Sequence, residues 1–206
     1  MDKFISHQGQ AIPLRRANVD TDVIIRMDRC ATFPRNQLGP WAFESLRIAP
    51  DGTLDPACVF NNHAFQHASI LVASDNFGCG SSREMAVWAL AGMGLRCVIA
   101  PGFGDIFYAN CFQNSLLPVR LPAATVDALL TQATDGSLTL EVNLLTQTIT
   151  GATDGTITFD IEPLRKSMLL EGLDEISITL THSAAITQWQ ERDRTARPWV
   201  YAALNI

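Results

Sequence analysis

A glycine–serine turn carries the side chains of this sequence that are best suited to chemistry. Residues 76–84 read NFGCGSSRE, which places Gly80, Ser81, Ser82 and Arg83 between a short apolar run and a helical pattern. Glycines let a backbone approach a ligand closely, and the first N–H groups of a helix attract anions. An arginine adds a planar fork that can bind a carboxylate or phosphate through two hydrogen bonds. Positive potential also favours loss of a serine proton, so the turn predicts an anion site with a reactive hydroxyl.

The same turn also has a purely structural interpretation. Ser81 and Glu84 have the spacing of a capping box, in which each side chain binds the other residue's backbone N–H at a helix start. Capping boxes are frequent helix starts, so the motif alone favours this interpretation. A cap does not require Ser82 or Arg83, however, and it leaves a serine able to face a ligand. Both interpretations stay open on the local sequence.

Other chemistries fit the sequence poorly. A phosphate-binding P-loop requires Gly-Lys-Ser/Thr at a fixed spacing, and a serine hydrolase requires a Gly-x-Ser-x-Gly elbow; the turn has neither. His63 and His67 have the i, i+4 spacing of metal ligands, but they have no intervening glutamate and no obvious third ligand. The five cysteines form no C-x-x-C pair, so their spacing offers no zinc or iron–sulfur site, and we expect no metal bound by this chain.

A second polar cluster, VDTD at residues 19–22, precedes a short apolar stretch. Asp20 is typical of an Asx turn, which would be a structural role. If this turn packs beside Ser81, Asp22 is placed to orient a base or a substrate-binding arginine.

Composition limits the class of protein. The chain has 206 residues, of which 47% are hydrophobic and 17% charged, as expected for one ordinary globular core. The net charge of −6 and the scattered basic residues argue against a nucleic-acid partner. No apolar stretch is long enough to span a membrane, and no secretory signal is recognisable. The odd number of dispersed cysteines favours a reducing, cytoplasmic location.

The elements that would position these residues follow an alternating pattern, which predicts an α/β fold with a parallel βαβ core. We expect buried strands at 68–74, 97–103 and 116–121, and helices at 82–94, at 105–114 with Asp105 as cap, and at 121–133. Antiparallel strands at 137–151 and 155–161 should meet at an Asp154-Gly155 hairpin, followed by helices at 162–172 and after Thr181. Residues 18–29 suggest an acidic turn and a short strand. Residues 30–67 are irregular and form a candidate substrate loop, and the chain is expected to be a single domain over residues 1–206.

The motifs together resemble the small subunit of 3-isopropylmalate dehydratase, in the aconitase superfamily. The likeness runs from about residue 18 to 199, and its segments are NVDTDVII (18–25), NFGCGSSRE (76–84), WAL (88–90), VIAPGFGDIFYANCFQNSLLPV (98–119) and LLEGLDEISITL (169–180). The resemblance implies a swivelling β/β/α domain that closes over the active site of a separate large subunit. That large subunit would hold a four-iron four-sulfur cluster, and none would be bound by this chain. The implied reaction isomerises a hydroxy-dicarboxylate by dehydration and rehydration, with iron as the Lewis acid.

The resemblance also implies roles for individual residues. Ser81 would be the base that takes the carbon-bound proton, and Ser82, Arg83 and Gly80 would bind a substrate carboxylate. Asp22 matches the aspartate at the edge of the active site. Arg35, in the segment FPRNQLGP, lies where relatives carry a substrate-binding arginine.

Some positions depart from the family pattern and keep alternatives open. Met85 and Val87 stand where His and Pro are usual, and Arg26 stands where a proline is expected. A paralogue acting on another hydroxy-dicarboxylate, such as a methyl-substituted malate or homoaconitate, fits the same motifs. A dicarboxylate-binding domain without catalysis and an independent serine hydrolase are the remaining hypotheses. A required iron–sulfur partner distinguishes the enzyme subunit from both.

Overall fold

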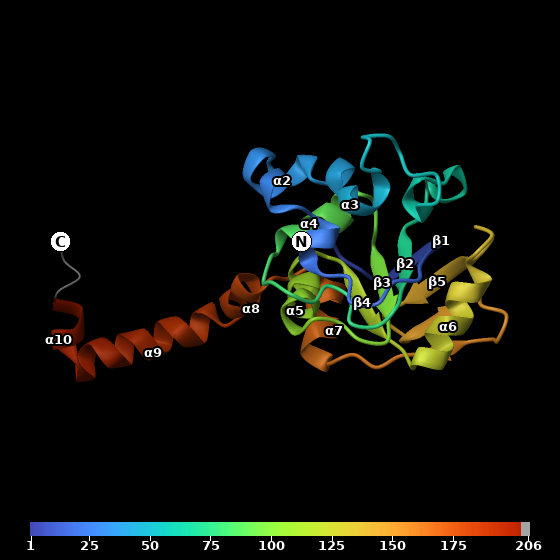
Figure 1. Ribbon diagram of the computed structural model, residues 1–206. Coiled ribbons are helices and arrows are strands. Elements are labelled where there is room, and N and C mark those ends of the chain that lie inside the picture. Colours follow the sequence, from blue (N-terminus) through green and yellow to red (C-terminus); the bar gives the residue numbers. More distant parts are fainter. Residues whose placement is uncertain (203–206) are drawn as a thin grey trace. The chain divides into compact units, whose positions relative to one another are not determined.

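A seven-stranded mixed sheet organises the first part of the chain (Figure 1), with the strand order β4-β3-β2-β1-β5-β6-β7. The computed structural model describes residues 1–202, and the chain divides into two compact units, Met1–Gly172 and Leu173–Ile206. The strands are β1 (Ser6–Leu14), β2 (Ile70–Ala73), β3 (Cys97–Ala100), β4 (Leu117–Arg120), β5 (Thr139–Asn143), β6 (Thr148–Thr150) and β7 (Ile157–Thr158). The α/β class with parallel and antiparallel strands is confirmed. The expectation of one domain over residues 1–206 stays a prediction.

Strand β1 joins the two halves of the sheet, and the sequence analysis did not predict it. Its residues 11–14 pair in parallel with β2, whereas its residues 6–10 pair in antiparallel fashion with β5. The strand reads SHQGQAIPL, so only its second half is apolar and no run of β-branched residues marks it. Its place in the sheet is set by its pairing with β2 on one side and β5 on the other.

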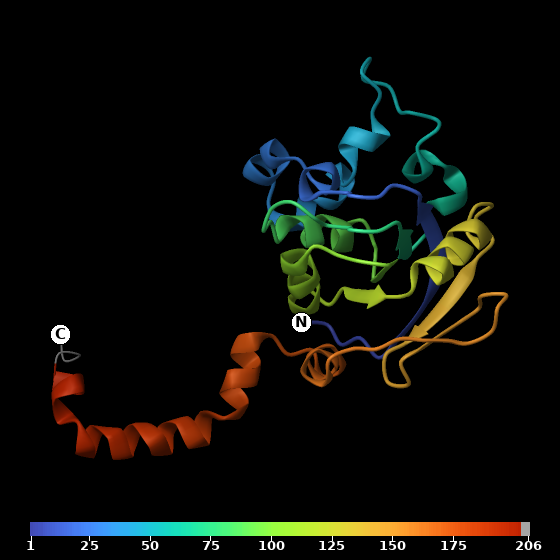
Figure 2. The same cartoon turned by 60° about the horizontal axis from the view of Figure 1, so that its bottom comes forward.

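Two hydrophobic cores lie on opposite faces of the parallel strands, because successive strand residues point to opposite sides. In β2, Leu71 and Ala73 belong to one core, while Ile70 and Val72 belong to the other. Helix α4 (Met85–Gly92) packs in the first core, and α6 (Ala123–Gln132) in the second, as the two views of the sheet show (Figures 1 and 2). Helices α5 (Asp105–Gln113) and α7 (Pro163–Glu171) also belong to this unit.

The predicted strands and helices of this βαβ core are confirmed, with corrected boundaries. The helix expected at 82–94 begins at Met85 and ends at Gly92. Asp105 is the first residue of α5 and does not cap it, because the N-cap position is Gly104. Pro122 likewise precedes α6 as its N-cap residue.

The short strand expected after the acidic turn is wrong, because residues 21–24 form helix α1 (Thr21–Ile24). The Asp20 carboxylate accepts a hydrogen bond from Val23 N at 2.8 Å and so caps this helix. The Asx-type role considered for Asp20 is therefore confirmed. Ile24 and Ile25 made the segment look like a strand, but both are buried in the first core.

The irregular segment 30–67 folds into short helical turns. They follow α2 (Met27–Thr32) and are η1 (Arg35–Gln37), η2 (Gly39–Trp41), α3 (Glu44–Arg47), η3 (Val59–Asn61) and η4 (His63–Phe65). Each is too short to give a periodic sequence signal.

In the antiparallel half, the strand expected at 137–151 splits into β5 and β6 at a turn in which the Asn143 side chain accepts a hydrogen bond from Thr146 N at 3.0 Å. The hairpin around Asp154-Gly155 is confirmed by the pairing of β6 with β7.

The second unit contains helices α8 (Glu175–Thr181), α9 (Ser183–Ala196) and α10 (Pro198–Tyr201). The helix expected after Thr181 is confirmed as α9, whereas α8, rich in β-branched residues, was not predicted. Asp193 links α9 to α10, because it accepts hydrogen bonds from the Arg197 Nε at 2.6 Å and the Tyr201 hydroxyl at 2.8 Å. Part of the aromatic tail at 197–206, namely 203–206, lies outside the described residues. Within residues 1–202, no helix is both long and apolar enough to cross a membrane.

Candidate functional site

The glycine–serine turn follows β2 and is held on both sides by backbone hydrogen bonds. Gly78 N donates to Val19 O at 2.7 Å on one side. On the other side, Phe77 exchanges two backbone hydrogen bonds with residues 102–104, at 3.0 and 2.9 Å. Gly78 has a φ of +72°, and a Cβ there would lie 2.2 Å from the Phe107 ring, so only glycine fits. The turn is therefore a fixed continuation of the sheet, at the carboxyl end of the parallel strands where ligands usually bind.

The Ser81 hydroxyl meets the hydroxyl of Thr21, with Oγ and Oγ1 2.8 Å apart. Thr21 is only 1% exposed, and its backbone N–H donates to Cys79 O at 3.0 Å. The capping box between Ser81 and Glu84 does not form, because α4 begins at Met85 and its N-cap residue accepts no side-chain hydrogen bond. The structural interpretation of the Ser81–Glu84 spacing is therefore wrong, and the serine hydroxyl is available for other chemistry.

Arg83 and Asp22 form a two-point ion pair across the turn. Arg83 Nη2 donates to Asp22 Oδ2 at 2.9 Å, and Nη1 donates to Oδ1. The Arg83 side chain is 16% exposed, while that of Asp22 is 60% exposed. Hydrogen bonding to Asp22 raises the pKa of the Arg83 guanidinium, which stays charged. Asp22 thus fixes the orientation of the arginine and leaves its remaining N–H groups for a ligand.

A buried asparagine connects the start of α4 to Arg35. Asn114, 8% exposed at the end of α5, accepts hydrogen bonds from Arg35 Nη2 at 2.7 Å and from Trp88 Nε1 at 3.0 Å. Its amide nitrogen donates to Glu84 Oε1 at 2.8 Å and to Asn110 O at 2.9 Å. The Arg35 guanidinium also lies 5.0 Å from the centre of the Trp88 ring. Arg35 is therefore joined to the turn through Asn114 and Glu84.

The other predicted site residues are exposed. Ser82 and Gly80 both lie on the surface of the turn, and Gly80 has a φ of +93°. Among the described residues, the Ser82 hydroxyl has no hydrogen-bond partner in the protein. The site thus brings Ser81 and Arg83 together with Asp22, links Arg35 indirectly, and leaves Ser82 and Gly80 open to a ligand.

Two residues of this arrangement had no assigned role in the sequence analysis. Thr21 lies inside the VDTD motif, so the sequence did draw attention to its position. Its contact with Ser81, however, exists only because residues 19–22 pack against the turn, and the local sequence does not show that packing. Asn114 lies in a segment that marked the resemblance, although nothing local distinguishes it from a surface asparagine. Both are identified by contacts between distant segments.

The cysteines near the site are not a set of metal ligands. Partial burial raises the pKa of the Cys30 thiol, an effect that the nearby Arg83 opposes. Burial also raises the pKa values of Cys97 and Cys111. Over residues 1–202, no group of three or more His, Cys, Asp or Glu side chains could hold a metal ion. The donor groups in this part of the chain do not fit an iron–sulfur cluster.

Comparisons with known proteins show the family and support the fold. Residues 1–124 match the family described as Aconitase C-terminal domain, which defines the class of the protein. The chain is 46% identical to the 3-isopropylmalate dehydratase small subunits of Roseobacter denitrificans, over 201 residues, and Nitrobacter hamburgensis, over 200 residues; each alignment covers 97% of this chain and 100% of the relative. The chain therefore belongs to the family of 3-isopropylmalate dehydratase small subunits.

A solved structure supports the fold. The crystal structure of 3-isopropylmalate dehydratase LeuD from Methanocaldococcus jannaschii superposes with a TM-score of 0.64. It covers 91% of this chain and 99% of the archaeal chain, at 24% sequence identity. At that identity the likeness concerns the fold alone.

Proposed function

We propose that this chain is the small subunit of a heteromeric hydro-lyase that isomerises 2-isopropylmalate to 3-isopropylmalate in leucine biosynthesis. The observation that carries the proposal is the turn at 78–84, at the carboxyl end of β2. There the Ser81 hydroxyl contacts Thr21, and Arg83 is held by the neighbouring Asp22. Curated relatives that are 46% identical over their full length carry this activity in their names. A paralogous role on a methyl-substituted malate or homoaconitate is not favoured by those names.

In this proposal Ser81 takes the carbon-bound proton of the substrate. The Ser81 oxygen is not used by a cap; it acts as an alkoxide that becomes a neutral hydroxyl when it takes up the substrate proton, and the Thr21 hydroxyl at 2.8 Å can donate a hydrogen bond to the alkoxide. The nearby guanidinium of Arg83 favours the negatively charged oxygen. The same serine then returns a proton when water is added back at the neighbouring carbon.

A substrate carboxylate is held by Arg83, Ser82 and the backbone at Gly80. Arg83 offers N–H groups beyond those bound by Asp22, and Ser82 offers an exposed hydroxyl. Arg35 is assigned to substrate binding as well, with Asn114 setting its position. Asp22 acts here by positioning Arg83.

The reaction requires a large subunit, and we propose that it carries a four-iron four-sulfur cluster. Such a cluster supplies the Lewis acid for the leaving hydroxyl. The part played by this chain is to hold the substrate carboxylate and move the proton. The complex is proposed to work in the cytoplasm, with no nucleic-acid or membrane partner, and residues 1–206 are proposed to act as one swivelling subunit.

The departures from the family pattern affect packing more than the ligand side of the turn. Val87 is fully buried in the first core, so it faces away from solvent. Arg26 is turned toward Asp28, with Nε and Nη2 at 3.0 and 3.1 Å from its carboxylate. Met85 is partly buried against the same core as Val87.

Anaerobic reconstitution tests the proposal. The purified chain is mixed with the large subunit of a 3-isopropylmalate dehydratase, and turnover is measured with 2-isopropylmalate, citramalate and homoaconitate, each subunit alone being the control. We expect turnover only with both subunits and the highest kcat/KM for 2-isopropylmalate. Turnover by this chain alone, or a clear preference for another dicarboxylate, would contradict the proposed function.

A further inference from the structure

A second concave site lies at the other end of α4. Its cavity of about 300 Å³ is lined by the apolar side chains of Ile12, Phe60, Phe65, Met93 and Leu95 and by the polar side chains of Arg47 and Gln66. Met93 directly follows α4, whereas the glycine–serine turn directly precedes it. Leu95 precedes β3, so the cavity lies near the amino-terminal end of that strand, whereas Ser81 lies beyond the carboxyl ends of the parallel strands. The cavity is thus separate from the proposed catalytic site.

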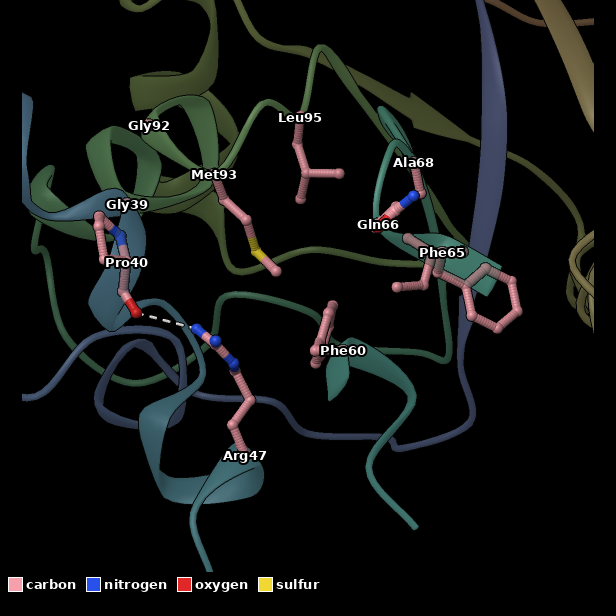
Figure 3. Close-up of a pocket in the computed structure, with 11 residues that line it drawn as sticks. Gly39, Pro40, Arg47, Phe60, Phe65, Gln66, Ala68, Gly92, Met93 and Leu95 are labelled. Atoms are coloured by element: carbon pink, nitrogen blue, oxygen red, sulfur yellow. Dashed lines mark hydrogen bonds between the residues drawn. The ribbon is translucent and has the colours of Figure 1, made fainter. Parts of the chain in front are cut away.

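The cavity combines apolar side chains on facing walls with polar groups, and its rim is fixed. Figure 3 shows Met93 and Leu95 on one side and Phe60 on the other, with their side chains directed toward the space between them. Two backbones cross closely at its rim, since a Cβ on Gly39 would lie 2.2 Å from Gly92 O. The cavity therefore exists before any ligand binds, as small-molecule sites usually do.

Arg47 is the charged group at the cavity. Its Nη1 donates to Pro40 O at 2.9 Å, as Figure 3 shows. Nη1 also donates to Ala42 O at 3.3 Å, and Nε donates to Asn61 Oδ1 at 3.3 Å. These neutral acceptors hold the guanidinium in place without neutralising it. Within residues 1–202, Arg47 forms no ion pair with a carboxylate, and its Nη2 has no hydrogen-bond partner. A partly buried cation with an unused nitrogen is suited to an anionic oxygen.

We infer that this cavity binds a small aliphatic monocarboxylate, with the carboxylate on Arg47 and the hydrocarbon chain against Phe60, Met93 and Leu95. A volume of about 300 Å³ is at the lower end of small-molecule sites, so the ligand is short. Arg47 is the single cationic side chain lining the cavity, so a second carboxylate would find the neutral amide of Gln66 and apolar side chains but no second positive charge. The site therefore differs in ligand chemistry from the dicarboxylate site on the turn.

The irregular segment 30–67 supplies much of this site, since Arg47, Phe60 and Phe65 all come from it. Of its short helices, η1 and η2 pack against α4, whereas η3 and η4, which carry Phe60 and Phe65, pack against β1. A role in ligand binding accounts for a long irregular segment in a compact unit. The inference does not depend on the proposed function.

Methyl NMR of methionine-labelled full-length chain tests the inference, because α4 carries one methionine at each end. Met93 lines the cavity, and Met85 lies next to the glycine–serine turn. The probe is 4-methylpentanoate, with 4-methylpentanamide as the neutral analogue of the same shape. We expect a saturable shift of the Met93 signal, at least tenfold weaker binding of the amide, and an unchanged signal from the buried Met168.

Variants locate the binding site. Arg47→Gln should weaken 4-methylpentanoate at least tenfold, whereas the exposed control Arg192→Gln and the turn variant Arg83→Lys should leave the Met93 shift intact. If Arg47→Gln fails to fold, the comparison of acid and amide on the unaltered chain still decides. No Met93 shift up to about 10 mM, a shift of Met85 alone, or equal binding of acid and amide would overturn the inference.

Discussion

Replacing Asn114 by aspartate tests whether the network behind the turn has the hydrogen bonds assigned to it. The two side chains have the same shape, and Oδ1 keeps its role as acceptor for Arg35 and Trp88. The change replaces the amide nitrogen, which lies 2.8 Å from Glu84 Oε1 and 2.9 Å from Asn110 O, by an oxygen. Two donated hydrogen bonds are lost, and two carboxylates are placed in contact.

The size of the effect follows from these contacts. A hydrogen bond to a charged acceptor contributes about 1.5–3 kcal/mol and a neutral one about 1 kcal/mol. Because a stronger attraction to Arg35 offsets part of the loss, Asn114→Asp should lower the free energy of unfolding by about 3 kcal/mol at neutral pH. For a chain of this length, that is a decrease in Tm of roughly 6–12 °C.

Asn62→Asp is the matched control, because Asn62 only accepts a hydrogen bond, from Ala64 N at 2.9 Å. Aspartate caps a helix as well as asparagine does, so this control should change stability by no more than about 0.5 kcal/mol. Urea unfolding of the two variants and the unaltered chain gives the comparison. A loss at Asn114→Asp no larger than at Asn62→Asp would refute the assigned network.

Three further predictions follow from individual contacts. Arg83→Lys keeps the charge but loses the fork, so kcat/KM in the reconstituted complex should fall about ten- to a hundredfold; a change within twofold would show that Arg83 does not hold the substrate. Gly104→Ala places a Cβ 2.5 Å from Gly78 O, and the displaced turn should reduce kcat more than tenfold while far-ultraviolet circular dichroism stays native; unchanged kcat would contradict the fixed turn. Arg29 lowers the pKa of Glu44 through side-chain hydrogen bonds. The pair therefore stabilises the folded chain at pH values above the pKa of Glu44 in the unfolded chain, about 4.3, and this stabilisation is lost as the pH falls through the pKa of Glu44 in the folded chain. Glu44→Gln should therefore lower Tm at pH 7, with a gap that closes on acidification; a gap independent of pH would disprove that origin.

The parallel half of the fold could be predicted because its strands are short apolar runs buried on both faces. β2, β3 and β4 are of this kind, and each is followed by turn residues that mark its end. β1 could not be predicted, since its polar first half pairs with β5, a segment more than 120 residues away. Residues 21–24 were expected to lie in a strand because Val23, Ile24 and Ile25 suggest one locally, whereas the Asp20 cap and the burial of Ile24 stabilise helix α1.

The site was predictable where short motifs carry the chemistry. Ser81 and Arg83 stand in one motif and Asp22 in another, and the two motifs meet across about 60 residues of chain. The capping box was indicated by spacing and is wrong, because Glu84 is drawn to the buried Asn114. The spacing of Ser81 and Glu84 shows that Glu84 could cap the helix, but its actual partner, Asn114, is brought to it by tertiary packing.

The central claim, that Ser81 moves the carbon-bound proton, is tested most directly by hydrogen exchange. The complex reconstituted anaerobically with a large subunit is incubated with 2-isopropylmalate in D₂O, and deuterium at the substrate carbon is followed by NMR for the unaltered chain and for Ser81→Ala. Since Ser81 caps no helix, the variant should lose only its hydrogen bond to Thr21, and the free energy of unfolding should fall by about 0.5–1.5 kcal/mol. Association with the large subunit should be unchanged, while exchange and turnover fall about 10²- to 10⁴-fold. Exchange at the unaltered rate by a folded, associated Ser81→Ala complex would contradict the account.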